Sequence, residues 1–122
     1  MQEGAAQFEH AVGMRPEVLA YRFDLNMLLW DAAQGSPPSG RPLVYGRAVE
    51  VAMGGVRLHP LHPEAYWLLG TAELMRIRKG RLDRIPAARM AFEAASALDP
   101  GYARVGSALR EICKLQKGGS GS

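Results

Sequence analysis

Apolar residues recur at helical spacing in six segments of the chain, and each segment is bounded by proline or glycine. Apolar positions that repeat every three or four residues indicate the buried face of an amphipathic helix. The pattern predicts six helices, at about residues 2–14, 17–33, 43–57, 63–79, 84–98 and 102–117. Short junctions that carry proline or glycine are typical of antiparallel helices stacked side by side. The chain is therefore predicted to be all-α.

Three prolines, Pro16, Pro60 and Pro100, mark a repeat inside this pattern. A small residue stands five positions before each proline and a leucine nine positions after it: Ala11, Gly55 and Ala95, then Leu25, Leu69 and Leu109. Small residues at one site and leucines at another are what contact between two helices requires. The repeat length is 44 and then 40 residues. The sequence therefore predicts successive helical hairpins.

The best copy of the repeat runs from Pro63 to Pro100. Its first half carries an aromatic and a Leu-Gly step, and its second half is rich in small residues: Trp67, Leu69 and Gly70, then Ala88, Phe92 and Ala95. This order resembles a tetratricopeptide repeat, a helical hairpin of about 34 residues. The resemblance covers residues 1 to about 116, with the extra length in loops. Asn26 departs from the pattern, because it stands where Gly70 does in the better copy.

The resemblance implies an α-solenoid of about two and a half hairpins. Domains of this family hold a segment of a partner protein in a groove lined by the first helix of each hairpin, and they use no cofactor. The resemblance therefore implies binding rather than catalysis. We expect a single domain over residues 1–117, followed by a flexible Gly/Ser linker of artificial origin at 118–122.

Composition adds little to this picture. The chain has 122 residues, 48% of them hydrophobic, and a net charge of +3, which is too small an excess to indicate nucleic-acid binding. Its single cysteine, Cys113, excludes an intrachain disulfide and fits a reducing compartment such as the cytoplasm. No apolar run reaches the roughly 18 residues that a membrane-spanning helix needs.

No constellation of catalytic residues is visible in the sequence. Acidic residues are scattered singly, so no carboxylate pair is predicted for acid–base chemistry. Gly54 and Gly55 lie in a helical pattern and indicate close packing, not a phosphate-binding loop. His59 and His62 lie in a turn between prolines, and Cys113 is expected on the packed face of the last helix. We therefore expect no enzyme, no metal and no cofactor.

The leucines of the repeat define which residues would face a groove. In each repeat, the residues two before, two after and five after the leucine are expected to face the groove. They are Phe23, Met27 and Trp30 for Leu25; Trp67, Thr71 and Leu74 for Leu69; and Ser107, Glu111 and Lys114 for Leu109. The first two sets are mainly apolar, which suits an apolar anchor or an amphipathic helix. The alternative is that the aromatics belong to the core between helices. Trp67 is the best groove candidate, because Tyr66 beside it is available for packing.

Two further functions stay open at this point. A basic run, Arg76, Arg78, Lys79, Arg81 and Arg84, offers a surface for nucleic acid or anionic lipid. Alternatively, the chain is an oligomerisation or spacer segment of a larger, bacterial-looking protein for secretion, polysaccharide assembly or regulation. The first predicted helix, with Ala6, Phe8, Ala11 and Val12, lacks a partner helix and is a candidate dimer contact.

Overall fold

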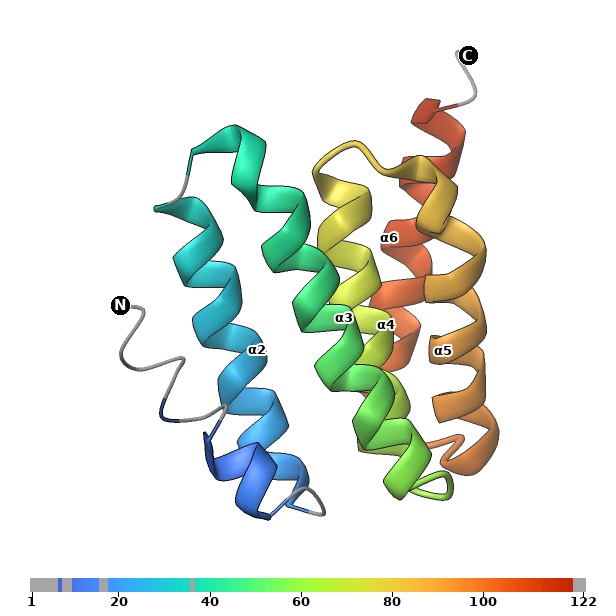
Figure 1. Ribbon diagram of the computed structural model, residues 1–122. Helices are drawn as coiled ribbons and strands as arrows, with labels where there is room; N and C mark the ends of the chain where they lie inside the picture. The colour runs from blue at the N-terminus through green and yellow to red at the C-terminus, as the bar shows by residue number, and fades with distance from the viewer. Residues whose placement is uncertain (1–6, 8–9, 16–17, 36, 120–122) are drawn as a thin grey trace. The chain divides into compact units, whose positions relative to one another are not determined.

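A computed structural model describes residues 7, 10–15, 18–35 and 37–119. The described chain is all-helical, with 86% helix, six helices and no strand. After a short helical stretch at residues 10–14 come the elements shown in Figure 1. They are α2 (Leu19–Gln34), η1 (Pro38–Gly40), α3 (Arg41–Leu58), α4 (Pro63–Arg78), η2 (Leu82–Arg84), α5 (Ile85–Leu98) and α6 (Ala103–Gly119). The five predicted helices from residue 17 onward are confirmed within a few residues, and α6 extends two residues into the expected linker. Most of the first predicted helix, at residues 2–14, lies outside the described residues.

Proline and glycine set the helix boundaries. Pro42, Pro63 and Pro86 each lie in the first turn of α3, α4 or α5. A first-turn proline is tolerated because its missing N–H would have no helical partner there, and its fixed φ already suits a helix. After α4, Gly80 adopts φ 102°, a left-handed conformation that favours glycine. Gly80 therefore turns the chain from α4 toward α5.

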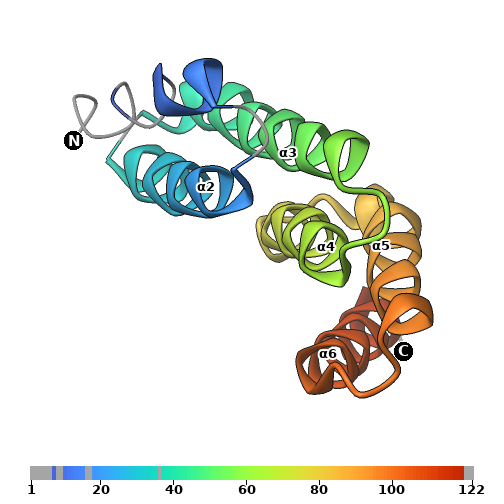
Figure 2. The same ribbon diagram turned by 90° about the horizontal axis from the view of Figure 1, so that it is seen from below.

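The chain divides into two compact units, Met1–Pro60 and Leu61–Ser122, here called unit 1 and unit 2. In unit 1, α2 and α3 pack side by side (Figures 1 and 2). Its core consists of Leu25, Leu29, Ala48 and Val51. Val12, from the first helical stretch, packs against this core together with Leu28, Trp30 and Val44. Ala6 and Phe8, expected beside Val12, lie outside the described residues.

In unit 2, α4 packs against α5, and α6 packs against both of them (Figure 2). The core residues are Leu74, Ile77, Ile85, Ala88, Phe92, Ala95, Val105 and Ile112. Phe92 of α5 is fully buried, and its ring lies directly against the backbone of α4 at Gly70. A Cβ atom at position 70 would stand 2.7 Å from Cε1 of Phe92. The predicted close approach of these two helices is therefore confirmed.

Gly70→Ala is expected to destabilise the protein by about 1–2 kcal/mol, although alanine is the better helix former. Overpacking a core costs about 1–3 kcal/mol, whereas helix propensity returns at most about 1 kcal/mol. Denaturant unfolding followed by circular dichroism measures the difference. Gly46→Ala in α3 is the matched control, since a Cβ atom there meets nothing within 4 Å. If Gly70→Ala were as stable as Gly46→Ala, the close contact with Phe92 would be wrong.

Candidate functional site

The most exposed apolar site among the expected groove residues lies on α2. Phe23, Met27 and Trp30 follow each other at helical spacing on one side of this helix, and we call them the α2 strip. Met27 is 68% exposed, whereas Phe23 and Trp30 are half-buried. Trp30 packs on Tyr45 of α3, with ring centroids 4.4 Å apart and planes inclined by 32°. The strip therefore presents an exposed methionine between two half-buried aromatics, of which Trp30 packs on Tyr45.

The charges around the α2 strip are acidic. Asp24 and Asp31 are both exposed, and the only cation on α2, Arg22, is buried. Nη1 of Arg22 donates a hydrogen bond to the carbonyl oxygen of Val51, at 2.8 Å. Burial lowers the pKa of Arg22, and the charge of Arg57 lowers it further. The guanidinium of Arg22 therefore lies between α2 and α3 and not on the exposed surface that carries the strip.

Gly54 on α3 makes room for the buried Arg22. A Cβ atom at position 54 would lie 2.3 Å from Nη1 of Arg22, and one at Gly55 would lie 3.1 Å from Cδ1 of Leu19. These two glycines are thus close-packing positions, as expected from the sequence. The burial of Arg22 itself was not foreseen, because a lone arginine in a helical pattern ordinarily indicates an exposed face.

The unit 2 residues of the expected groove are less accessible. Trp67 and Thr71 are half-buried, and Trp67 packs against the unit 2 core. The guanidinium carbon of Arg104, on α6, lies 5.3 Å from the centroid of the Trp67 ring, a cation–π distance. Leu74 is only 5% exposed and belongs to the core, so its placement in a groove was wrong. The reason is that α4 packs against two helices of unit 2 and buries more of its circumference than α2 does.

The third set of expected groove residues lies on α6, and its members differ in exposure. Ser107 and Lys114 are exposed, and Glu111 is half-buried against Arg78 of α4. Cys113 is exposed, so its expected position on a packed face was wrong. Val105 and Ile112, seven residues apart, define the buried side of α6. Cys113 follows Ile112 and therefore points about 100° away from that side.

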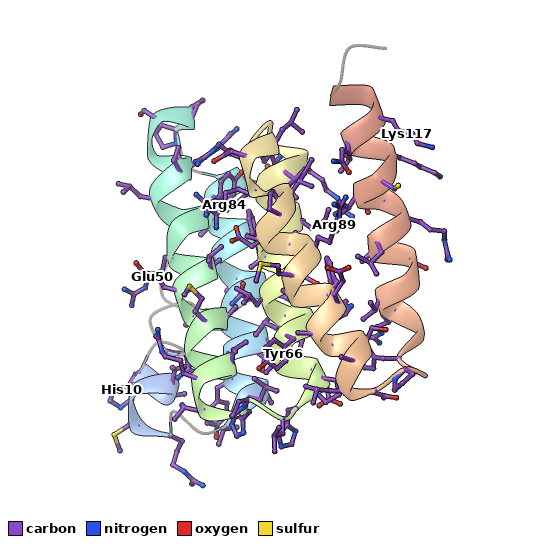
Figure 3. All side chains as sticks on the ribbon, turned by 90° about the vertical axis from the view of Figure 1, so that its right-hand side faces the viewer. His10, Glu50, Tyr66, Arg84, Arg89 and Lys117 are labelled. Atoms are coloured by element: carbon purple, nitrogen blue, oxygen red, sulfur yellow. The ribbon has the colours of Figure 1, made fainter. Side chains whose placement is uncertain are left out.

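Arg89 of α5, labelled in Figure 3, also contacts α6. Its Nη2 donates a hydrogen bond to Oε1 of Gln116.

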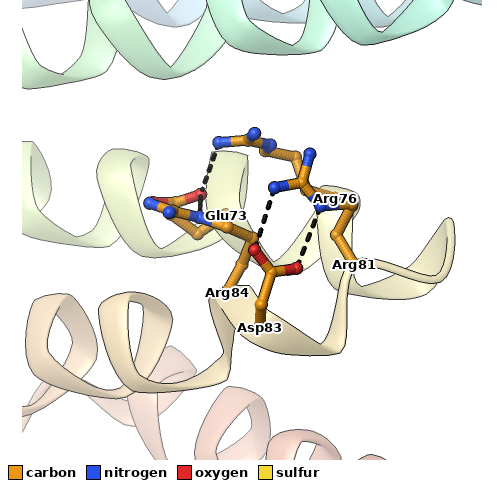
Figure 4. A network of polar contacts seen from close by, with 5 residues as sticks. All are labelled: Glu73, Arg76, Arg81, Asp83 and Arg84. Atoms are coloured by element: carbon orange, nitrogen blue, oxygen red, sulfur yellow. Dashed lines mark hydrogen bonds and ion pairs between the residues drawn. The ribbon is translucent and has the colours of Figure 1, made fainter.

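Part of the basic run surrounds a buried carboxylate, shown in Figure 4. Glu73 of α4 is 2% exposed. Arg84, in η2, donates from Nε to Oε1 at 3.0 Å and from Nη2 to Oε2. Arg76, one turn along α4, donates from Nη1 to Oε1 at 3.3 Å. This cluster fixes the loop after α4 to the helix, a role that sequence spacing does not reveal.

The other arginines of the run also hold carboxylates. Arg81 binds Asp83 through two hydrogen bonds of 2.9 Å, which lower the pKa of Asp83 from 3.8 to about 2. Arg78 binds Glu111 through two hydrogen bonds of 2.6 Å and lowers the pKa of Glu111. Four of the five cations are thus engaged within the protein.

The turn before α4 carries the two histidines singled out in the sequence, His59 and His62. His62 and Glu64, both exposed, stand 3.9 Å apart at the start of α4. Within the described ranges, no group of three or more His, Cys, Asp or Glu side chains is placed to hold a metal ion. In the same ranges, no helix combines the length and apolarity needed to cross a bilayer.

Comparisons with known proteins supply no assignment for this chain. No protein-family model matches its sequence, and no curated protein matches it. The functional argument therefore rests on the side chains and on their surroundings.

Proposed function

We propose that this chain is a protein-binding module, built from helical hairpins of the tetratricopeptide type, and that the α2 strip holds an amphipathic partner segment. The observation that carries the proposal is the 68% exposure of Met27 between Phe23 and Trp30. The repeated prolines and the α2–α3 and α4–α5 hairpins support the repeat assignment.

The chemistry of the strip suits an apolar anchor. Methionine is unbranched and polarizable, so it adapts to the shape of an incoming aliphatic or aromatic side chain. Trp30 is held by Tyr45 and loses little further freedom when a partner packs against its edge. A rigid aromatic beside an adaptable methionine favours binding, because fewer side chains must be ordered on association. We therefore place the partner's main apolar residue over Met27.

Met27→Glu is expected to weaken capture of an amphipathic helical peptide by about tenfold or more. A charge at the contact removes roughly the 1.5–3 kcal/mol that burial of a methionine contributes. The probe is a fluorescein-labelled, uncharged amphipathic peptide of about 16 residues, which matches the length of α2. Fluorescence anisotropy measures the affinity. Circular dichroism should stay unchanged, because the side chain at position 27 is mostly exposed.

Met90→Glu is the matched control for this experiment. Met90, on α5, is 72% exposed and lies outside the α2 strip. The same charge introduced there should leave peptide binding intact. Equal losses in both variants would contradict a specific site on α2. Absence of binding to the unsubstituted protein would instead favour a spacer role.

A further inference from the structure

We infer that the segment captured by the α2 strip is basic, with two cations seven residues apart on a helix that meet Asp24 and Asp31. This inference rests on the proposed function and names the chemistry of its partner. Asp24 precedes Met27 by three residues, and Asp31 follows it by four. Seven residues make almost two turns of an α-helix, so the two carboxylates share one side of α2. Along the helix axis, one carboxylate therefore lies on each side of the exposed Met27.

Both carboxylates are open to a partner. Asp24 and Asp31 are exposed, and neither has an ion-pair partner among the described residues. Three acidic residues of unit 2, Glu73, Asp83 and Glu111, are instead each paired with an arginine. The acidic pair on α2 thus stands beside an exposed apolar side chain, and the guanidinium of Arg41 nearby donates to the backbone oxygens of Ala33 and Gln34.

No cation on α2 offsets this charge. Arg22 is the only basic residue of the helix, and its guanidinium is buried against Gly54 of α3. A partner that carries phosphates or acidic side chains would meet like charge at both ends of the strip. A basic amphipathic segment would instead find complementary charge at both ends and an apolar contact in the middle.

The spacing of the carboxylates defines the partner further. Seven residues correspond to about 10 Å along the axis of α2. A helical partner matches this distance with lysine or arginine at positions i and i+7 and a large apolar residue at i+3 or i+4. Exposed ion pairs contribute modestly to affinity, so the apolar residue anchors the segment and the two cations select it.

Three labelled helical peptides test this inference on the intact chain. They share the apolar face of the peptide used with Met27→Glu and carry lysine, glutamine or glutamate at i and i+7. The lysine peptide should bind about tenfold more tightly than the glutamine peptide and more tightly still than the glutamate peptide, at low salt. Added salt should compress this range, because exposed charges are screened. Fluorescence anisotropy measures each affinity.

Substitution of the two aspartates gives the decisive comparison. The double variant Asp24→Asn and Asp31→Asn should bind all three peptides about equally, and Asp24→Lys with Asp31→Lys should reverse the order. Both sites are exposed, so circular dichroism should show unchanged helix content. If the unsubstituted protein binds all three peptides equally and loses them in Met27→Glu, the proposed function stands and the basic partner is wrong. If it binds none of them, both are wrong.

Discussion

Phe92→Ala is expected to lower the free energy of unfolding by about 3–5 kcal/mol, the range observed when a buried phenylalanine is truncated. Phe92 is fully buried, and its ring fills the space that Gly70 leaves open on α4. Alanine at position 92 would leave a cavity between α4 and α5 that both helix backbones border. A loss of this size is a large fraction of the roughly 5–15 kcal/mol that stabilises a domain. Urea unfolding followed by circular dichroism measures it.

Met90→Ala is the control on the same helix. Met90 is 72% exposed, so its truncation should change stability by no more than about 0.5 kcal/mol. The double variant Gly70→Ala and Phe92→Ala should lose less than the sum of the two single losses, because removal of the ring relieves the clash at position 70. Additive losses would mean that the ring and Gly70 do not touch.

The helix boundaries and the contact between Gly70 and Phe92 were predictable because both depend on residues that are recognisable in the local sequence. Prolines at the first turn of α3, α4 and α5 and glycine after α4 fix boundaries through backbone geometry alone. Gly70, directly after a run of large residues at 66–69, indicates a close neighbour, and the ring of Phe92 is that neighbour. These signals need no knowledge of the rest of the fold.

The exposed surface was harder to predict, because helical periodicity does not say how many neighbours a helix has. Leu25 is 1% exposed, whereas Leu69, its counterpart in the repeat, is half-buried and Leu68 is 3% exposed. The buried side of α4 is therefore broader than that of α2 and rotated relative to it. A register counted from Leu69 as if it matched Leu25 consequently placed Leu74 on the wrong side of α4. Contact of α4 with both α5 and α6 explains the difference.

The ion pairs of the basic run also could not be predicted from the spacing of residues in the sequence. Glu73 and Arg84 are 11 residues apart, and Arg78 and Glu111 are 33 apart. Only the Glu73–Arg76 pair has the i, i+3 spacing that a helix makes recognisable. Five cations in a short stretch therefore looked like one basic surface, although two of them, Arg78 and Arg84, connect different elements of unit 2.

Among these ion pairs, those of Glu73 are expected to contribute most to stability, because its carboxylate is buried. Its carboxylate is 2% exposed and accepts hydrogen bonds from both Arg84 and Arg76. The carboxylate joins η2, just before α5, to the last turns of α4 (Figure 4). Removal of one member of a buried ion pair leaves the other charge without compensation in a poorly solvated place. If Glu73 were removed, Arg76 and Arg84 would be the charged groups left without a carboxylate partner.

Glu73→Ala is therefore expected to destabilise the protein by about 2–3 kcal/mol, somewhat below the roughly 3–5 kcal/mol typical of a fully enclosed pair. The reduction follows from the side chain of Arg84, which is 31% exposed and can turn toward water. Asp83→Ala is the control: it also removes a carboxylate from an arginine, but that pair is exposed, and no measurable change is expected. Denaturant unfolding of both variants separates the two cases. If Arg84→Ala removed as much stability from the Glu73→Ala background as from the unsubstituted protein, the two side chains would not be coupled, and the buried cluster would not be what connects α4 to η2.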